Sequence, residues 1–220
     1  MTLRERYVRD GIVFPLRALT AAEVAAFRDF AEEHLGRDGD DVRRLHLEHE
    51  WAHALATHPA VVAPVVELLG DADDIAIWGT LLLRKPPRSD EYVAWHQDGA
   101  YSEFRGDDSL SAWIALGDST AESGCMRVIA GSHRARLPHV ETGDERNMLR
   151  QRQAVGIPID EAAAVDVTLR AGEMSLHHLD LVHGSAPNRS TVARTGFIVR
   201  FVRISGAGTW SPLTPVRRSL

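Results

Sequence analysis

The 220-residue sequence has little of several things, and each shortage excludes a class of protein. Its single cysteine, Cys125, cannot form an internal disulfide. No run of about 18 apolar residues occurs, and the opening residues MTLRERYVRDG lack the apolar centre of a secretion signal. We therefore expect a soluble, cytoplasmic protein with no membrane partner.

Charge of one sign is not in large excess either. Lys and Arg number 25 against 31 Asp and Glu, which gives a net charge of −6, and the two signs are interspersed. A basic stripe that would follow a phosphate backbone is missing, so nucleic acid is not an expected partner. The length and the apolar content of 44% suit one core, and we predict a single domain over residues 1–220, as a monomer or homodimer.

Helical spacing of apolar residues is typical of the first third of the chain. Thr20 and Glu23 predict a capping box, and helices are expected over about 20–36, 42–56 and 58–70. A short strand and turn, DGIVFPLRAL, precede the first of these helices. Residues 1–70 are thus predicted to be a mainly helical flank.

From about residue 75 the pattern changes to short runs rich in β-branched and aromatic residues, such as SLSAWIALGD and RTGFIVRFVRI. Several such runs at regular spacing predict a sandwich, barrel or jelly roll. A long polar stretch interrupts them at residues 134–160. A loop of that length inside a compact domain is typical of a lid, and we call this stretch the lid segment.

Eleven histidines make metal binding worth testing, and three segments compete for the metal. The first, HEWAH, resembles a zinc peptidase pattern, with His49 and His53 one helical turn apart and Glu50 between them. Polar neighbours such as His46 instead favour a solvated helix face with Trp51 turned inward. A zinc hydrolase stays an alternative.

The second segment is WHQDGAY. Side chains alternate along a strand, so His96 and Asp98 project on the same face with head groups close enough to share one ion. Two histidines and one carboxylate on one side of an iron leave positions open for oxygen chemistry.

The third segment, LHHLDLVHGSAPNRSTVARTGFIVRF, supplies a further histidine. If APNRST is a hairpin turn centred between Asn188 and Arg189, His183 lies across from Arg194, and Ser185 shares its face. Arginine in that position favours bidentate capture of a carboxylate beside the metal.

Two other histidines, His177 and His178, are rivals for His183 as the distal ligand. His177 shares the face of His183 but lies six residues away, roughly 20 Å along an unbroken strand, which excludes both from ligating one ion. His178 points the opposite way. We expect His133 and His139, which flank the start of the lid segment, to face solvent or to lie behind the metal ligands.

The order and spacing of these segments resemble the phytanoyl-CoA dioxygenase family of iron(II)- and 2-oxoglutarate-dependent oxygenases. The resemblance runs from about residue 7 to 203 and rests on DGIVF, LLLRKPP, WHQDGAY, SAWIALGDSTAESGCMRVIAGSHR and LVHGSAPNRSTVARTGFIVRF. It implies a mainly β fold with flanking α-helices, a double-stranded β-helix (jelly roll, cupin-like) over residues 75–205. Ala130 departs from the pattern, because the family usually has proline there.

Carried over residue by residue, the resemblance makes His96, Asp98 and His183 the iron ligands. An aspartate at position 98 favours hydroxylation or another oxidation over halogenation, because halogenating relatives have a small residue there. The implied cofactor is Fe(II), with 2-oxoglutarate and O2 as co-substrates.

The same comparison assigns three residues to the co-substrate. Arg194 would bind the distal carboxylate of 2-oxoglutarate, and Ser185 would hydrogen-bond that carboxylate. Gln97, beside the first ligand, would orient the co-substrate or the substrate.

The expected substrate pocket combines residues after the first motif with residues of the lid segment. Their polar, cationic and aromatic groups favour a small polar metabolite or natural-product intermediate, hydroxylated at an unactivated C–H with release of succinate and CO2. Desaturation, cyclisation or epimerisation at the same iron, or a non-catalytic jelly-roll binding protein, are the alternatives. The pocket residues are Tyr101, Phe104, Arg105, Asn147, Met148 and Gln151.

Overall fold

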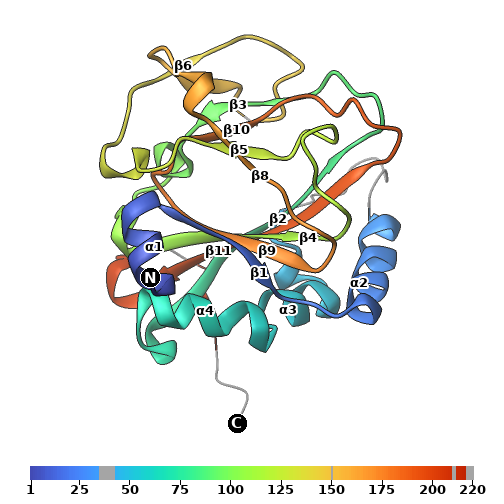
Figure 1. Ribbon diagram of the computed structural model, residues 1–220. Helices are drawn as coiled ribbons and strands as arrows, with labels where there is room; N and C mark the ends of the chain where they lie inside the picture. Colours follow the sequence, from blue (N-terminus) through green and yellow to red (C-terminus); the bar gives the residue numbers. More distant parts are fainter. Residues whose placement is uncertain (35–42, 150, 210–211, 217–220) are drawn as a thin grey trace.

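Two facing β-sheets with helices against one of them make up the fold (Figure 1). The computed structural model describes residues 1–34, 43–149, 151–209 and 212–216, without the side chain of Tyr101. The major sheet is antiparallel, in the order β1 (Ile12–Arg17), β9 (Glu173–His178), β4 (Ser109–Ala115), β11 (Arg194–Arg203), β2 (Ile75–Lys85) and β12 (Thr214–Pro215).

The minor sheet faces the major one and carries four short antiparallel strands. Their order is β3 (Val93–His96), β10 (His183–Ser185), β5 (Met126–Val128) and β8 (Val165–Val167). From β2 to β5, and again from β8 to β11, successive strands alternate between the two sheets, which is the arrangement of a jelly roll. The predicted mainly β fold with flanking helices is confirmed.

Side chains alternate along each strand of the major sheet, so one set faces the helices and the other faces the minor sheet. Phe197, Val199 and Phe201 of β11 point to the helices and belong to the larger apolar cluster. Ile198, between them, belongs with Trp113 to a second cluster between the two sheets. The inner face therefore mixes apolar residues with the polar residues of the site.

The helices cover the outer face of the major sheet or lie beside it (Figure 1). They are α1 (Leu3–Asp10), α2 (Ala21–His34), α3 (Glu50–Ala56) and α4 (Pro59–Leu69). The Thr20 hydroxyl accepts from the Glu23 amide and the Glu23 carboxylate accepts from Thr20 N, which confirms the predicted capping box.

Two expectations about the first third of the chain change. The predicted helix over 42–56 is shorter, since α3 is preceded by a 3-10 turn at Leu45–Leu47. The strand predicted in DGIVFPLRAL pairs with β9, so the major sheet includes residues outside the predicted 75–205 core. The expected helix stop at Gly36 lies outside the described residues.

The lid segment contains a small hairpin of its own, β6 (His139–Glu141) and β7 (Gln153–Val155). Asn147 fastens it to the minor sheet, because its Oδ1 accepts from Ala94 N at 3.2 Å and from Leu149 N at 3.3 Å. The segment is therefore attached beside the strand that carries His96.

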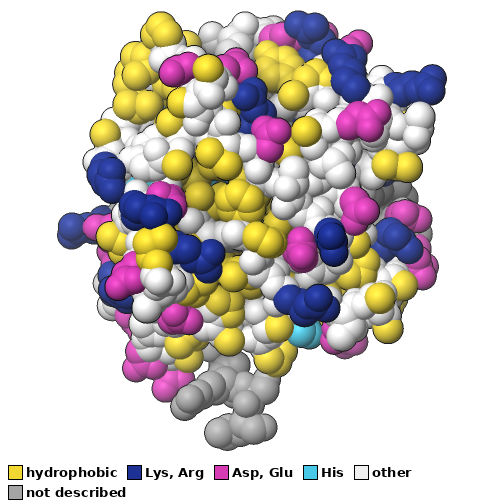
Figure 2. Space-filling view, viewed as in Figure 1, with side chains coloured by type: hydrophobic (Ala, Val, Ile, Leu, Met, Phe, Trp, Pro, Cys, Tyr) yellow, Lys and Arg dark blue, Asp and Glu magenta, His cyan; other side chains and the backbone are white. Residues whose placement is uncertain are grey.

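No single described helix is long and apolar enough to cross a membrane. Helices α3 and α4 meet the length and composition criteria only together, and they are bent by 45° at their break. Their apolar residues belong to the core against the major sheet. Figure 2 shows basic and acidic side chains interspersed over one face of the molecule.

Candidate metal centre

His96, Asp98 and His183 form a buried group whose ligand atoms all lie within 4.8 Å of one another. The minor sheet creates this group, because His183 of β10 pairs directly with His96 of β3. Asp98 begins the 3-10 turn that follows β3. Among the described residues this is the one group of three or more His, Cys, Asp or Glu able to hold a metal.

The two histidines are oriented by the backbone. Each Nδ1 lies 2.9 Å from the carbonyl oxygen two residues earlier, Ala94 O for His96 and Leu181 O for His183. A carbonyl only accepts, so Nδ1 carries the proton and Nε2 keeps its lone pair for a metal. The donor set of two imidazoles and one carboxylate fits iron(II) and leaves coordination positions open.

Asp98 is held by side chains of the opposite sheet. Ser111 Oγ of β4 donates to Oδ2 at 2.9 Å, and Arg200 Nη2 of β11 donates to Oδ1 at 3.1 Å. His177 Nε2 of β9 lies 3.6 Å from Oδ2. We call Ser111, Arg200 and His177 the carboxylate row, because they lie side by side across three neighbouring strands.

Burial and charge set the protonation of the ligands. Burial opposes ionisation of Asp98, yet the guanidinium of Arg200 helps to hold its pKa well below the ordinary value. Burial also lowers the pKa of His96 and of His183, the latter well below its usual range. An ionised carboxylate beside two neutral imidazoles is the state that binds a divalent metal.

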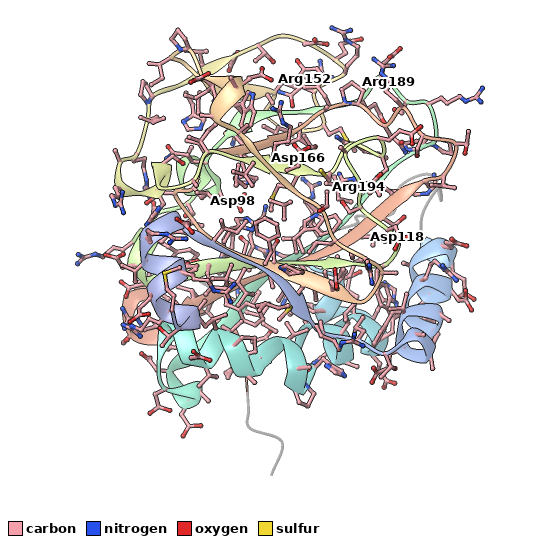
Figure 3. The ribbon with its side chains drawn as sticks, in the orientation of Figure 1. Asp98, Asp118, Arg152, Asp166, Arg189 and Arg194 are labelled. Carbon is pink, nitrogen blue, oxygen red and sulfur yellow. The ribbon has the colours of Figure 1, made fainter. Side chains whose placement is uncertain are left out.

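A cavity of about 680 Å³ opens beside the ligands, between the two sheets. Arg194 lies at its wall with a side chain only 1% exposed, and its guanidinium stacks over the ring of Trp113 at 5.1 Å. Its Nε and Nη2 have no hydrogen-bond partner among the described residues. Figure 3 shows Arg194 and Asp98 in the same layer between the sheets.

A buried guanidinium with unpaired nitrogens is unfavourable by itself and is stabilised by a bound anion. Burial lowers the pKa of Arg194 to about 10, so it stays charged at neutral pH. A dicarboxylate with one end on the metal and the other on Arg194 fits these residues, as 2-oxoglutarate would.

Ser185 also lines the cavity, and a buried lysine lies behind it. Lys85 Nζ donates to Ser185 Oγ at 2.6 Å and to the carbonyl oxygens of Ser185 and Ala186. Because the Ser185 oxygen accepts from Lys85, its hydroxyl hydrogen remains for a ligand oxygen. Burial, and then the charge of Arg194, lower the pKa of Lys85 to about 7.

The predicted hairpin that places His183 across from Arg194 is wrong. Arg194 pairs with Lys85 on β2, while His183 pairs with His96 and Val128 in the other sheet. The connection between β10 and β11 is a longer loop that crosses between sheets. His183 and Arg194 nevertheless line the same cavity, because the two sheets face each other.

The predicted 20 Å between His177 and His183 is also wrong, because it assumed an unbroken strand. Strand β9 ends at His178 and the chain turns into the minor sheet before His183. The His177 and His183 ring centroids are 4.8 Å apart. His177 lines the cavity, whereas the ring of His178 packs near that of His133, at 5.0 Å.

Gln97 does not line the cavity. Its fully buried amide donates to Ala135 O at 2.8 Å and to Asp180 O at 2.5 Å, and its oxygen accepts from Leu137 N at 2.7 Å. Its own N–H donates to His139 Nε2 at 3.1 Å. Gln97 therefore ties the start of the lid segment to the segment that carries His96 and Asp98 on either side of it.

The predicted pocket residues divide into two groups. Met148 and Gln151 of the lid segment line the cavity. The other described ones do not: Asn147 is buried in the hydrogen bonds that fasten the lid segment, Phe104 packs in a core cluster 5.1 Å from the Trp78 ring, and Arg105 is exposed. The side chain of Tyr101 is outside the described part.

HEWAH does not form a metal group in the part of the chain that the structure describes. His49 is the N-cap of α3 and has an extended conformation, so it lies outside the helix Glu50–Ala56 that carries His53. Trp51 is buried and packs 5.7 Å from the ring of Phe197. The interpretation of a helix with Trp51 turned inward is confirmed.

Reasoning from the sequence missed Ser111, Arg200 and Lys85. Alternation in SLSAWIA places Ser111 on the face opposite Leu110 and Ala112, and the same rule places Arg200 opposite Val199 and Phe201. Side-chain alternation could therefore have identified Ser111 and Arg200, because it places a serine and an arginine on the inner face of two buried strands.

The chain matches a known protein family over most of its length. The model of the family described as phytanoyl-CoA dioxygenase (PhyH) matches residues 7–196. A probable alpha-ketoglutarate-dependent hypophosphite dioxygenase of Stutzerimonas stutzeri is 28% identical over 172 residues, covering 77% of this chain. The chain covers only 58% of that relative's own length.

Two solved structures extend the likeness to almost the whole chain. The apo form of ThoJ, a non-heme monooxygenase, has a TM-score of 0.81 and 34% identity, covering 98% of this chain and 80% of ThoJ. The epimerase SnoN, in complex with Fe3+, alpha ketoglutarate and nogalamycin RO, has a TM-score of 0.74 and 27% identity, covering 98% and 92%. The chain belongs to the phytanoyl-CoA dioxygenase family.

Proposed function

We propose that this protein is an iron(II)- and 2-oxoglutarate-dependent dioxygenase that hydroxylates an unactivated C–H bond of a small polar metabolite or natural-product intermediate, releasing succinate and CO2. One observation carries the proposal. The group of His96, Asp98 and His183 shares a cavity with Arg194, whose buried guanidinium has two nitrogens unpaired within the described residues. A metal and a dicarboxylate together account for both features.

Each protein group has a limited task. His96, Asp98 and His183 would hold Fe(II), which supplies the activation of O2 when bound. Arg194 and the Ser185 hydroxyl would fix the distal carboxylate of 2-oxoglutarate, and Lys85 would orient that hydroxyl. No side chain is assigned as a general base, because the protein contributes orientation, charge and exclusion of water.

The lid segment would complete the substrate pocket. Met148, Leu149 and Gln151 line the cavity, and Asn147 holds this stretch against β3. Closing an active site from solvent protects reactive species from side reactions. The mixed lining suits a small polar substrate better than a long acyl chain.

Two measurements test the proposal. Anaerobic addition of Fe(II) and 2-oxoglutarate should give a visible charge-transfer band that needs both components. A screen of metabolites with Fe(II), 2-oxoglutarate and O2 should then reveal substrate-stimulated succinate release, with a product heavier by one oxygen atom. Absence of the band in metal-loaded protein would favour a non-catalytic jelly-roll binding protein.

Epimerisation is the second candidate outcome, and the likeness to the epimerase SnoN supports it. The product mass separates the reactions. A gain of one oxygen means hydroxylation, a loss of two hydrogens means desaturation or ring closure, and an unchanged mass with altered retention means epimerisation.

A further inference from the structure

The cavity lining has an excess of positive charge. Four arginines line it, Arg43, Arg84, Arg194 and Arg200, and among the described lining residues Asp98 is the one carboxylate. In the proposed function, Asp98 and one carboxylate of 2-oxoglutarate neutralise the divalent metal. The other carboxylate of 2-oxoglutarate neutralises Arg194. Positive charge at Arg200 is then left facing the remaining space, where the substrate binds.

The guanidinium of Arg200 is held in a fixed orientation that suits ligand binding. Its guanidinium stacks 5.4 Å from the centre of the Trp78 ring, and Nη2 donates to Asp98 Oδ1 at 3.1 Å. These contacts fix the plane of the group and use one nitrogen. The buried Nε has no hydrogen-bond partner within the described residues. A guanidinium fixed in this way binds a planar or tetrahedral oxoanion with little loss of side-chain entropy.

A second polar side chain of the same row faces this space. His177 is 2% exposed and lines the cavity; its Nε2 lies 3.6 Å from Asp98 Oδ2, beyond hydrogen-bond distance, and neither of its ring nitrogens has a hydrogen-bond partner among the described residues. A buried ring nitrogen without a hydrogen-bond partner is unfavourable, and a bound oxoanion would supply that partner. His177 and Arg200 stand on either side of Ser111 in the carboxylate row, so both face the space beside Asp98.

Resting on the proposed function, we propose that Arg200 and His177 form an oxoanion site for the primary substrate. The substrate is therefore a small acid, carrying a carboxylate, a phosphonate or a similar group. The acidic group must carry at least two oxygens on one atom, because it accepts from both Arg200 and His177, and these lie on strands separated by β4.

The position of the site also limits where oxidation occurs. Arg200 donates to Asp98, so an oxoanion bound by its Nε lies beside the candidate metal ligands. The oxidised atom is then only a few bonds from the acidic group. The cavity of about 680 Å³ must also hold 2-oxoglutarate, which keeps the substrate small.

Equilibrium binding to the loaded protein tests the substrate class. The probes are straight-chain carboxylates and phosphonates of two to six carbons, each paired with its neutral amide or ester. They are titrated calorimetrically into the anaerobic Ni(II) complex saturated with 2-oxoglutarate. We expect some acids to bind at least tenfold more tightly than their neutral partners, and the carboxylate and phosphonate series identify which oxoanion is preferred. Equal binding of acids and neutral partners, or failure of every acid to bind, overturns the proposal.

Variants assign the preference to the site. Arg200→Gln should reduce the ratio of acid to neutral affinity to about one, and His177→Phe should reduce it in part. Arg127→Gln is the matched control, because Arg127 also stacks over a tryptophan, 5.6 Å from the Trp95 ring, and pairs with Glu161 and Asp166, but does not line this cavity. An unchanged ratio in Arg200→Gln overturns the assignment.

The two proposals fail separately. The charge-transfer band of the Fe(II) and 2-oxoglutarate complex, and slow succinate formation without substrate, report the metal and co-substrate sites alone. Because Arg200 also donates to Asp98, the affinities of Arg200→Gln are measured at Ni(II) and 2-oxoglutarate concentrations that saturate this variant. Loss of acid preference in the saturated variant supports the oxoanion site, whereas loss of the band in the unmodified protein contradicts the proposed function.

Discussion

His177 and Arg200 lie in one cross-strand row of the major sheet, each paired with Ser111 between them. The row faces the cavity, where its three side chains meet Asp98 from the opposite sheet. Asp98 is therefore oriented by strands that carry neither His96 nor His183. The geometry of the candidate metal site depends on how the two sheets pack together.

The first prediction concerns this packing. Ser111→Ala removes the hydrogen bond that Ser111 Oγ donates to Asp98 Oδ2 at 2.9 Å. Groups behind a metal ligand typically contribute about 10–100-fold in metal affinity, and we expect a loss of that size in a competition titration with Ni(II). Ser175→Ala is the control, because Ser175 is also fully buried, on the neighbouring β9. Equal metal affinity in the two variants would contradict the role of Ser111.

The ligands themselves give the second prediction. Asp98→Ala and His183→Ala should bind no stoichiometric Fe(II) and should lose succinate formation, because each removes one of three ligands. His53→Ala should keep both properties, since His53 is exposed on α3. A zinc hydrolase built on HEWAH would instead lose its metal in His53→Ala and keep it in Asp98→Ala. Full activity of Asp98→Ala would sink the ligand assignment.

Arg194→Ala should raise the requirement for 2-oxoglutarate more than it lowers the maximal rate. We expect KM for 2-oxoglutarate to rise about 100-fold, because a buried charge-assisted pair is lost while the metal ligands are untouched. Arg189→Ala provides the comparison, since Arg189 lies on the surface in the same connection between β10 and β11 and pairs with Asp90 (Figure 3). A KM unchanged in Arg194→Ala would rule out its contact with the co-substrate.

Co-substrate affinity should depend on pH through Lys85. Its pKa in the free protein is lowered to about 7, so the ammonium is charged below pH 7 and loses its proton above it. A bound carboxylate favours the charged form, so binding above pH 7 must take up a proton, and the Kd for 2-oxoglutarate should rise by up to about tenfold per pH unit from 7 to 9. Lys85→Met should bind more weakly and without this slope. A slope that persists in Lys85→Met assigns it to another group.

The sequence picked out the three residues of the candidate metal site because the relevant rule is local: His96 and Asp98 are two residues apart, the motif order supplied His183, and the structure brings the three together. Arg194 lines the same cavity, although the hairpin from which we expected this does not exist. What the pattern could not provide was pairing between strands distant in the chain, which depends on how two sheets pack.

His177 illustrates the limit. Alternation placed it correctly on the face of His183, but the turn after β9 brought the rings to 4.8 Å instead of the expected 20 Å. For Gln97 and Asn147 the sequence suggested a functional role that the structure does not show. Their polar side chains beside a site indicated ligand contact, and the structure uses them to fasten the lid segment to the strand of His96.

Gly196 sets the position of Trp113, the ring on which Arg194 stacks. A Cβ at Gly196 would overlap the six-membered edge of that indole, which is 4% exposed and has little room to move. Overpacking of this kind costs about 1–3 kcal/mol, so Gly196→Ala should lower Tm by several degrees and raise KM for 2-oxoglutarate as Arg194 loses its support. Gly117→Ala, where a Cβ meets no atom within 4 Å, should change neither value. Adding Trp113→Phe to Gly196→Ala should recover part of the Tm, because the smaller ring relieves the overlap. A Tm that does not recover would mean that the overlap is not the cause.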